Sequence, residues 1–381
     1  MTIPATGRSS DVPAPRRVWL GVLSFVGLAV AGLIVLGVIE RRAGPVPFAL
    51  GVALALIPVP LLAAGLLALD RYEPEPRRLL LFTFVWGATV AALIALVLNT
   101  ADLLALRALL DDTTANMLTA SLGAPIFEEC AKGAVLVGLL RMRRHEFDGP
   151  IDGIVYGGLV GLGFAMTENV LYYSSAAVHT GMPGLVGTFL LRGVFSPFLH
   201  PLFTAATGIG LGYAALARPG RGRWLPPAAG LLVAIGLHAT WNTAAGHRHL
   251  VSTYLFVVLP VFVAVLAVAQ WERRRIVRLI QQVLPMYVQS GLLAPADPPM
   301  VSSAPARRRA RAFLARTRGP AAARALRDFQ HAATELALLH DRAARGQLDA
   351  AAFGSRREAL LRVLVAARIG FSGPTRRPAL R

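Results

Sequence analysis

Residues 151–173 read IDGIVYGGLVGLGFAMTENVLYY, a stretch with the length and apolar character of a membrane-spanning helix. Gly153, Gly157 and Gly161 recur every four residues along it, so a neighbouring helix is expected to approach at backbone distance. Glu168 lies almost two turns beyond Gly161 on nearly the same face and should point toward that contact. A carboxylate in that position needs a partner or a chemical role, because buried charge is costly in a membrane.

The composition extends this pattern to most of the chain. Of the 381 residues, 55% are apolar and only 16% are charged, and the mean hydropathy is +0.56. A soluble domain carries roughly 25% charged residues, so the composition excludes an ordinary soluble enzyme and a disordered chain. The single cysteine, Cys130, excludes an intramolecular disulfide and a zinc site of several thiolates. We expect it to be a buried small residue rather than a nucleophile.

Eight stretches are long and apolar enough to cross a membrane. They are 18–39, 46–69, 79–99, 117–140, 151–173, 195–217, 225–245 and 251–271. The predicted fold is therefore all-α, a polytopic membrane helix bundle of about eight transmembrane helices over residues 18–271. A cytoplasmic segment, 1–17, precedes the bundle, and a small helical cytoplasmic region, 272–381, follows it. The first span is expected to be a retained anchor rather than a cleaved signal peptide.

The arginines predict the orientation. The connections on the side of both termini contain sixteen arginines. The opposite connections contain only Arg41, Arg42, Arg107, Arg192 and Arg248. Because basic residues concentrate on the inner side, we expect both termini in the cytoplasm and the protein in the plasma membrane.

The C-terminal region differs in composition from the bundle. Residues 272–381 contain 21 basic and 7 acidic side chains, against 18 and 14 in residues 1–271, so most of the net charge of +18 lies there. The proline-containing stretch 293–311 is expected to be a flexible linker, followed by helices at 321–345 and 350–369 that form a hairpin. This basic tail is expected either to contact anionic inner-leaflet lipid or to form a solvated stalk. Nucleic acid is not an expected partner.

The fourth predicted span contains three ionisable residues. Glu128 and Glu129 are adjacent, and Lys132 follows at i+4 and i+3, so the ammonium can pair with either carboxylate. Lys132 is the only lysine among 39 basic residues, which favours specific chemistry for an ammonium at this position. A cluster that only fixes helix packing is the alternative.

Three further polar residues lie in later spans: His200, His238 and Asn242. The last two are i, i+4 neighbours and should present their tips to one spot. With Glu168 they are predicted nearer the outer ends of their helices, whereas Glu128 and Glu129 lie near the midplane. Acids and imidazoles around a cavity suit the activation of water by a carboxylate base or a bound metal, as in amide hydrolysis.

These residues resemble the PrsW family of intramembrane proteases, which is related to the CAAX-prenyl endopeptidases and their bacterial Abi relatives. The similarity over about residues 70–270 comprises Glu128-Glu129-x-x-Lys132, Phe164-x-x-x-Glu168, His200 and His238-x-x-x-Asn242. It implies regulated cleavage of a membrane-anchored substrate, typically an anti-sigma factor, near the extracytoplasmic side.

The resemblance also implies roles for these residues. Glu128 or Glu129 would activate water, assisted by Glu168 and His200, with His238 and Asn242 on the oxyanion and Lys132 as a supporting ion pair. The residues leave a glutamic and a metal mechanism open. For a divalent metal such as zinc, the expected ligands are Glu129, Glu168, His200 and His238.

Two other classes of protein remain as alternatives. A proton- or ion-coupled transporter also places Glu, Lys and His in a membrane, and it predicts internal repeats. A non-catalytic scaffold would use the polar cluster to bind a partner helix.

Overall fold

The computed structural model describes residues 15–372 except 71, 73–74, 144–145, 219 and 246–248. Most of the predicted N-terminal segment 1–17, and Arg248, lie outside the described residues. The described chain is helical and contains no strand. Its α-helices are α1 Pro15–Ala43, α2 Pro45–Leu56, α3 Val59–Leu69, α4 Arg77–Trp86, α5 Ala92–Arg107, α6 Asp112–Leu118, α7 Ala124–Met142, α8 Pro150–His179, α9 Gly181–Phe189, α10 Leu199–Leu216, α11 Leu225–Ala245, α12 Leu250–Thr253, α13 Leu259–Gln289, α14 Asp297–Ser302, α15 Ala304–Ala344 and α16 Ala350–Ser372.

Short π-helical turns connect several of these helices into longer crossings. They are η1 Gly87–Ala91, η2 Thr119–Gly123, η3 Leu190–Phe195 and η5 Tyr254–Val258, and a 3₁₀ turn, η4, spans Arg221–Trp224. Five of the resulting helical stretches are long and apolar enough to cross a membrane: Pro45–Leu69, Arg77–Arg107, Pro150–His179, Gly181–Leu216 and Leu250–Gln289. The polytopic helical bundle predicted from the sequence is thus confirmed.

Helix α8 lies at the centre of the bundle. Its most apolar window is 83% buried by protein, against 28% or less for the other four stretches. The predicted close approach is made by α10, because a Cβ at Gly161 or Gly153 would lie 2.3 Å or 2.0 Å from the carbonyl oxygens of His200 and Gly208. Large apolar side chains such as Leu61 point outward, as expected of a lipid-facing surface.

The sixth crossing differs in extent from the prediction of 195–217. The corresponding candidate membrane span runs through α9, η3 and α10 from Gly181 to Leu216, with a non-helical break at 196–198. Pro197 explains the break, because proline has no N–H to donate to the preceding turn. Cys130 also differs from the prediction of burial and is exposed on α7. Its neighbour Glu129, about 100° away on the helix, points into the core instead.

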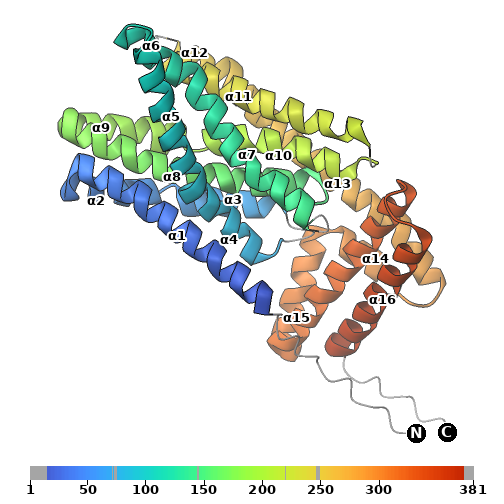
Figure 1. The fold of residues 1–381 in the computed structure, drawn as a ribbon. Helices are drawn as coiled ribbons and strands as arrows, with labels where there is room; N and C mark the ends of the chain where they lie inside the picture. Colours follow the sequence, from blue (N-terminus) through green and yellow to red (C-terminus); the bar gives the residue numbers. More distant parts are fainter. Residues whose placement is uncertain are drawn as a thin grey trace, which may run out of the picture.

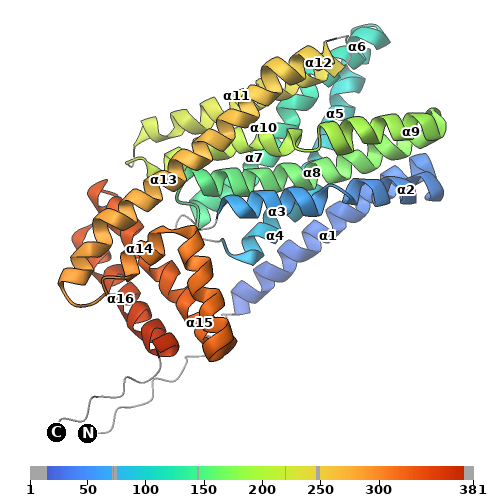
Figure 2. The ribbon, with the colours of Figure 1, turned by 180° about the vertical axis from the view of Figure 1, so that it is seen from behind.

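The C-terminal helices α14–α16 gather at one end of the bundle, where α1 begins (Figures 1 and 2). They share an apolar core with the last turns of α13, which includes Leu284, Leu336 and Leu364. Residues 293–311, expected to be a flexible linker, form a turn, α14 and the start of α15. Leu293 and Val301 are buried in this core, so apolar anchors order the stretch despite its prolines. Helix α13 also continues across the boundary predicted at residue 271.

Candidate active site

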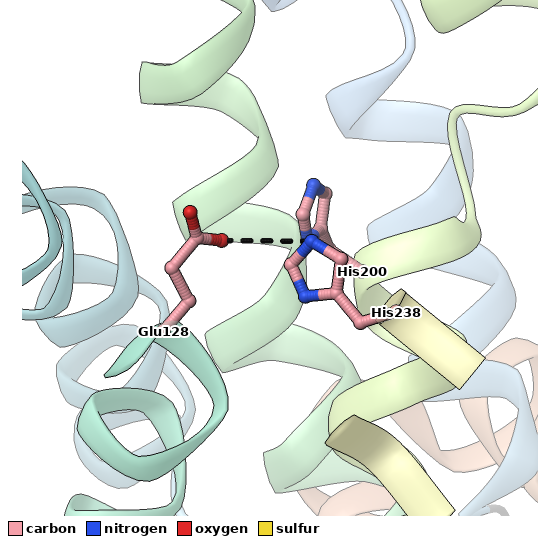
Figure 3. A group of neighbouring side chains, drawn as sticks. All are labelled: Glu128, His200 and His238. Carbon is pink, nitrogen blue, oxygen red and sulfur yellow. Dashed lines mark ion pairs between the residues drawn. The ribbon is translucent and has the colours of Figure 1, made fainter. Parts of the chain in front are cut away.

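Three helices bring one carboxylate and two imidazoles together inside the bundle. Glu128 extends from α7, His200 from the first turn of α10 and His238 from α11 (Figure 3). One potential ligand atom of each lies within 4.8 Å of the others, and all three residues are buried. Two histidines and one carboxylate form the ligand set of many catalytic zinc sites, so these residues fit a divalent metal. Proline near the start of α7 and the close approach at Gly161 explain how the local sequence positions this group.

A second carboxylate orients His238. Its Nδ1 lies 3.1 Å from Glu129 Oε1. Its Nε2 faces Glu128 Oε2 at 3.8 Å, and Figure 3 shows this ion pair. The other oxygen of Glu129 accepts a hydrogen bond of 3.0 Å from the Thr204 hydroxyl. A carboxylate on the remote nitrogen of a metal-binding histidine fixes the ring and leaves the other nitrogen for the ion.

His200 has a similar arrangement. Its Nε2 lies 2.8 Å from Glu168 Oε2, and its Nδ1 lies 3.1 Å from Lys132 Nζ. The ring of Phe164 packs against the imidazole with 5.3 Å between ring centroids. An ammonium has no lone pair and can only donate, so Nδ1 is the acceptor and Nε2–H donates to Glu168.

Lys132 lies at the centre of the cluster. It is fully buried, and its Nζ lies 2.8 Å from Glu129, 3.4 Å from Glu128 and 3.7 Å from the centroid of the Phe164 ring. The predicted pairing with either glutamate is therefore a pairing with both. In this arrangement the ammonium supplies part of the positive charge that the buried carboxylates of Glu128 and Glu129 need.

Arg192 supplies the second cation, which the sequence analysis assigned to an outer connection. Its Nε donates to Asn169 Oδ1 at 2.7 Å, and its Nη2 pairs with Glu168. The guanidinium also lies over the Tyr172 ring, 3.9 Å from its centroid. The sequence did indicate a role for Arg192, because apolar residues flank it on both sides, at Leu185–Leu191 and Gly193–Phe195. A charge in such a stretch needs a partner. The π-helical turn η3 holds it at the level of His200, and such turns are frequent at functional sites.

A small cavity lies beside this pair. It has a volume of about 20 Å³, enough for about one ordered water, and its lining includes Glu168, Arg192, His200 and Asn242. Asn242 does not share a spot with His238, because its Nδ2 donates to the Ala120 carbonyl at 2.9 Å. The two members of the predicted i, i+4 pair therefore have different partners, since His238 contacts Glu129 and Glu128.

The group of possible metal ligands that lie close together is not identical with the set expected from the sequence. It contains Glu128 and both histidines, whereas Glu129 and Glu168 are bonded to His238 and His200 as their partners. Asn99 is another residue that the sequence analysis missed, and its Nδ2 donates to Glu128 Oε1 at 3.2 Å. No periodicity connects residues on different helices, so no sequence signal pointed to this contact.

The cluster lies toward one end of the bundle. From the ends that face α14–α16, helical rise places Glu168 about 27 Å along α8 and His238 about 20 Å along α11. Both positions lie past the midpoint of their helices, so the site is nearer the ends that are remote from α14–α16. Glu129 and Glu128 both contact His238 at this level, and their position near the membrane midplane stays a prediction.

The fold and the site define a polytopic membrane protein with a buried His/Glu centre suited to a catalytic metal. The chain belongs to the PrsW family, since the family model described as "PrsW family intramembrane metalloprotease" matches residues 75–268, about half of the chain. All the site residues described above fall within this range, and α14–α16 fall outside it.

Curated relatives carry the same family name. The chain is 32% identical over 148 residues to Protease PrsW of Geobacillus kaustophilus (strain HTA426), which is 39% of this chain and 59% of the relative. It is 30% identical over 155 residues to Protease PrsW of Clostridioides difficile (strain 630), which is 41% of this chain and 62% of the relative. The chain thus spans about 60% of the length of these relatives. No solved structure matches the chain.

Proposed function

We propose that this chain is an intramembrane endopeptidase that hydrolyses a peptide bond of a membrane-anchored protein. The observation that supports this most directly is the buried group of Glu128, His200 and His238, held at membrane depth by partner carboxylates. An ion pair that only fixed helix packing would need Lys132 and one carboxylate, whereas this group adds a second carboxylate and two imidazoles. The family match supports the same class of reaction.

Glu128, His200 and His238 would hold a divalent metal, and the donor set favours zinc. When bound, such an ion acidifies water and polarises the scissile carbonyl. His200 Nδ1 becomes available for this role when Lys132 turns away from it, because the ammonium occupies that nitrogen in the present arrangement. Lys132 keeps Glu129 as a partner throughout, since that contact is its shortest.

The remaining carboxylates take different roles in this proposal. Glu129 bonds to Lys132, Thr204 and His238, and it is completely buried, so it orients His238 rather than accepting a proton from water. Glu168 Oε2 bonds to His200, which leaves Oε1 for the adjacent cavity. We therefore propose that Glu168 accepts the proton of the attacking water as the general base.

Donors at the cavity would stabilise the developing oxyanion. Asn242 uses one N–H for the Ala120 carbonyl and has a second N–H available on the same amide. Arg192 lines the same cavity and holds Glu168 in place. Preorganised donors of this kind are worth about 3–4 kcal/mol each in acyl-transfer enzymes.

The depth of the site favours a cut near the side of the membrane opposite α14–α16. With the arginine distribution of the sequence, this side is extracytoplasmic, both termini are cytoplasmic and the membrane is the plasma membrane. A membrane-anchored protein, such as an anti-sigma factor, is the proposed substrate. Anionic lipid at the basic C-terminal region is the second proposed partner.

The test compares new peptide termini in membrane fractions of cells that express the wild-type chain, Glu168→Gln, Glu128→Gln or His238→Ala at equal levels. Glu40→Gln and His179→Ala are matched controls, because both residues are exposed and remote from the cluster. We expect termini near the outer edge of single-pass proteins with the wild type and both controls, and none with the three site variants. Equal termini from all chains would refute hydrolysis, and proton flux lost in the same variants would then support a transporter.

Metal content separates the proposed roles. In purified protein, Glu128→Gln and His238→Ala are expected to lose the ion measured by mass spectrometry, whereas Glu168→Gln keeps it and loses cleavage. Full metal content in all three variants would refute the ligand assignment without refuting hydrolysis.

A further inference from the structure

An apolar groove runs along the outer face of the bundle between α3 and α13, both of which lie toward the viewer in Figure 2. It has a volume of about 210 Å³, and α10 forms its floor. Leu62 and Leu66 of α3 face Phe262, Val265 and Leu266 of α13 across it. These residues lie in two of the stretches able to cross a membrane, so the groove opens to lipid.

A second, basic cavity lies on the same helix beyond the apolar stretch. Its volume is about 410 Å³, and its lining includes Tyr72, Gln270, Arg273, Arg274 and Arg278. On α13 the residues that line the groove are followed, three or four positions further on, by those that line the basic cavity. The two cavities therefore lie on one face of this helix, which is apolar along the groove and cationic at the basic cavity.

The arginines of this cavity differ in their hydrogen-bond partners. Arg273 donates to the Leu69 carbonyl at 2.9 Å and so fixes the end of α3 against α13. Within the part of the chain that the structure describes, Arg274 and Arg278 have no hydrogen bond or ion pair. Two uncompensated guanidinium groups at a membrane surface attract an anion.

The distance along α13 from the groove to the basic cavity matches the thickness of one leaflet of a bilayer. Eleven residues separate Phe262 from Arg273, which corresponds to about 16 Å of helix. Half of a hydrocarbon core is about 15 Å thick. Trp271, which is exposed, lies at the transition, where amphipathic aromatic rings concentrate in membrane proteins.

We propose that this groove and the basic cavity together bind one anionic phospholipid. An acyl chain lies between α3 and α13, and the phosphate group lies against Arg274 and Arg278. A transmembrane helix of a substrate fits less well, because its inner end usually carries Lys or Arg, which these arginines repel. The site is separate from the His/Glu cluster, so the inference does not depend on peptide hydrolysis.

The test measures lipid binding to the full chain purified in detergent, by native mass spectrometry. The probes are phosphatidylglycerol, phosphatidylcholine with the same acyl chains, and glycerol phosphate. We expect tighter binding of phosphatidylglycerol than of either other probe. Arg274→Gln/Arg278→Gln is expected to weaken it about 30-fold, which corresponds to about 1 kcal/mol for each arginine. Arg41→Gln/Arg42→Gln, which removes the same charge from exposed positions in the last turn of α1, outside the basic C-terminal region, is expected to leave it unchanged.

A second pair of variants tests the groove. Gly65 lines it, and a Cβ there meets nothing within 4 Å, so Gly65→Leu fills the groove without a clash in the helix. Gly27→Leu is the matched control, because Gly27 also has open space and lies on α1. We expect weaker phosphatidylglycerol binding in the first variant only.

Three results would overturn the proposal. They are equal binding of phosphatidylcholine, an equal loss in the Arg41→Gln/Arg42→Gln control, and unchanged lipid binding in Gly65→Leu. If the last variant instead lowers cleavage alone, the groove belongs to the substrate helix.

Discussion

Replacing Lys132 with methionine is the most demanding test of the buried cluster. The ammonium is fully buried and contacts Glu129 at 2.8 Å, Glu128 at 3.4 Å and His200 Nδ1 at 3.1 Å. Methionine keeps similar volume and removes the charge, which leaves two adjacent buried carboxylates without this counter-charge. Removing one partner of a buried ion pair typically costs about 3–5 kcal/mol, and we expect Lys132→Met to lower the free energy of unfolding by that amount.

The assay is unfolding of the purified chain in mixed micelles by increasing SDS, followed by tryptophan fluorescence. The double variant Lys132→Met/Glu129→Gln removes one of the unpaired charges and is expected to recover about half of the loss. Arg316→Met is the control, because Arg316 is exposed on α15 and such surface changes usually stay within about 0.5 kcal/mol. A loss below about 1 kcal/mol for Lys132→Met, or a double variant less stable than the single, would refute the reasoning.

Three further predictions concern packing, the choice of lysine and pH. Gly161→Ala places a Cβ 2.3 Å from the His200 carbonyl oxygen and is expected to lower stability by about 1–3 kcal/mol and to reduce metal binding. The control Gly133→Ala, whose Cβ would lie 3.4 Å from its nearest atom, should change neither the stability measured by calorimetry nor the metal content. Lys132→Arg inserts a larger cation into a fully buried position and is expected to cost about 1–3 kcal/mol in the SDS assay despite its retained charge. Burial lowers the pKa of His331 in α15 from 6.5 to about 4, so the unfolded chain binds more protons between these values. His331 should therefore contribute about 2–3 kcal/mol to the loss of stability from pH 6.5 to pH 4, and circular dichroism of the full chain should show a loss smaller by that amount in His331→Gln.

The sequence predicted the fold class because membrane spans depend on local composition. Each of the eight predicted ranges coincides mostly with helix, and the glycine ladder of 151–173 correctly predicted a close helix contact. The extent of the sixth crossing and the folded stretch 293–311 were not predictable in the same way. Both depend on packing: η3 continues the helix to the break at Pro197, and distant apolar residues bury Leu293.

The sequence predicted most residues of the candidate site but not the contacts between them. Ionisable residues in apolar stretches identified Glu128, Glu129 and Glu168, because their charge is costly wherever the helix lies. Which oxygen meets which nitrogen depends on helix rotation and on the level at which helices pass each other. For this reason the predicted ligand set differed from the group in the structure, and the contact of Asn99 with Glu128 gave no signal.

The sequence by itself determined that the chain crosses the membrane many times, which residues bear buried charge, and where α8 meets another helix closely. These features follow from hydropathy, periodicity and the absence of a glycine side chain, all of which are local. Only the tertiary structure decided that Arg192 neutralises Glu168, that Glu129 orients His238 and that α3 and α13 enclose a groove ending in arginines. Such pairings arise between helices far apart in the chain, where packing and the cost of an unpaired buried charge select the partner.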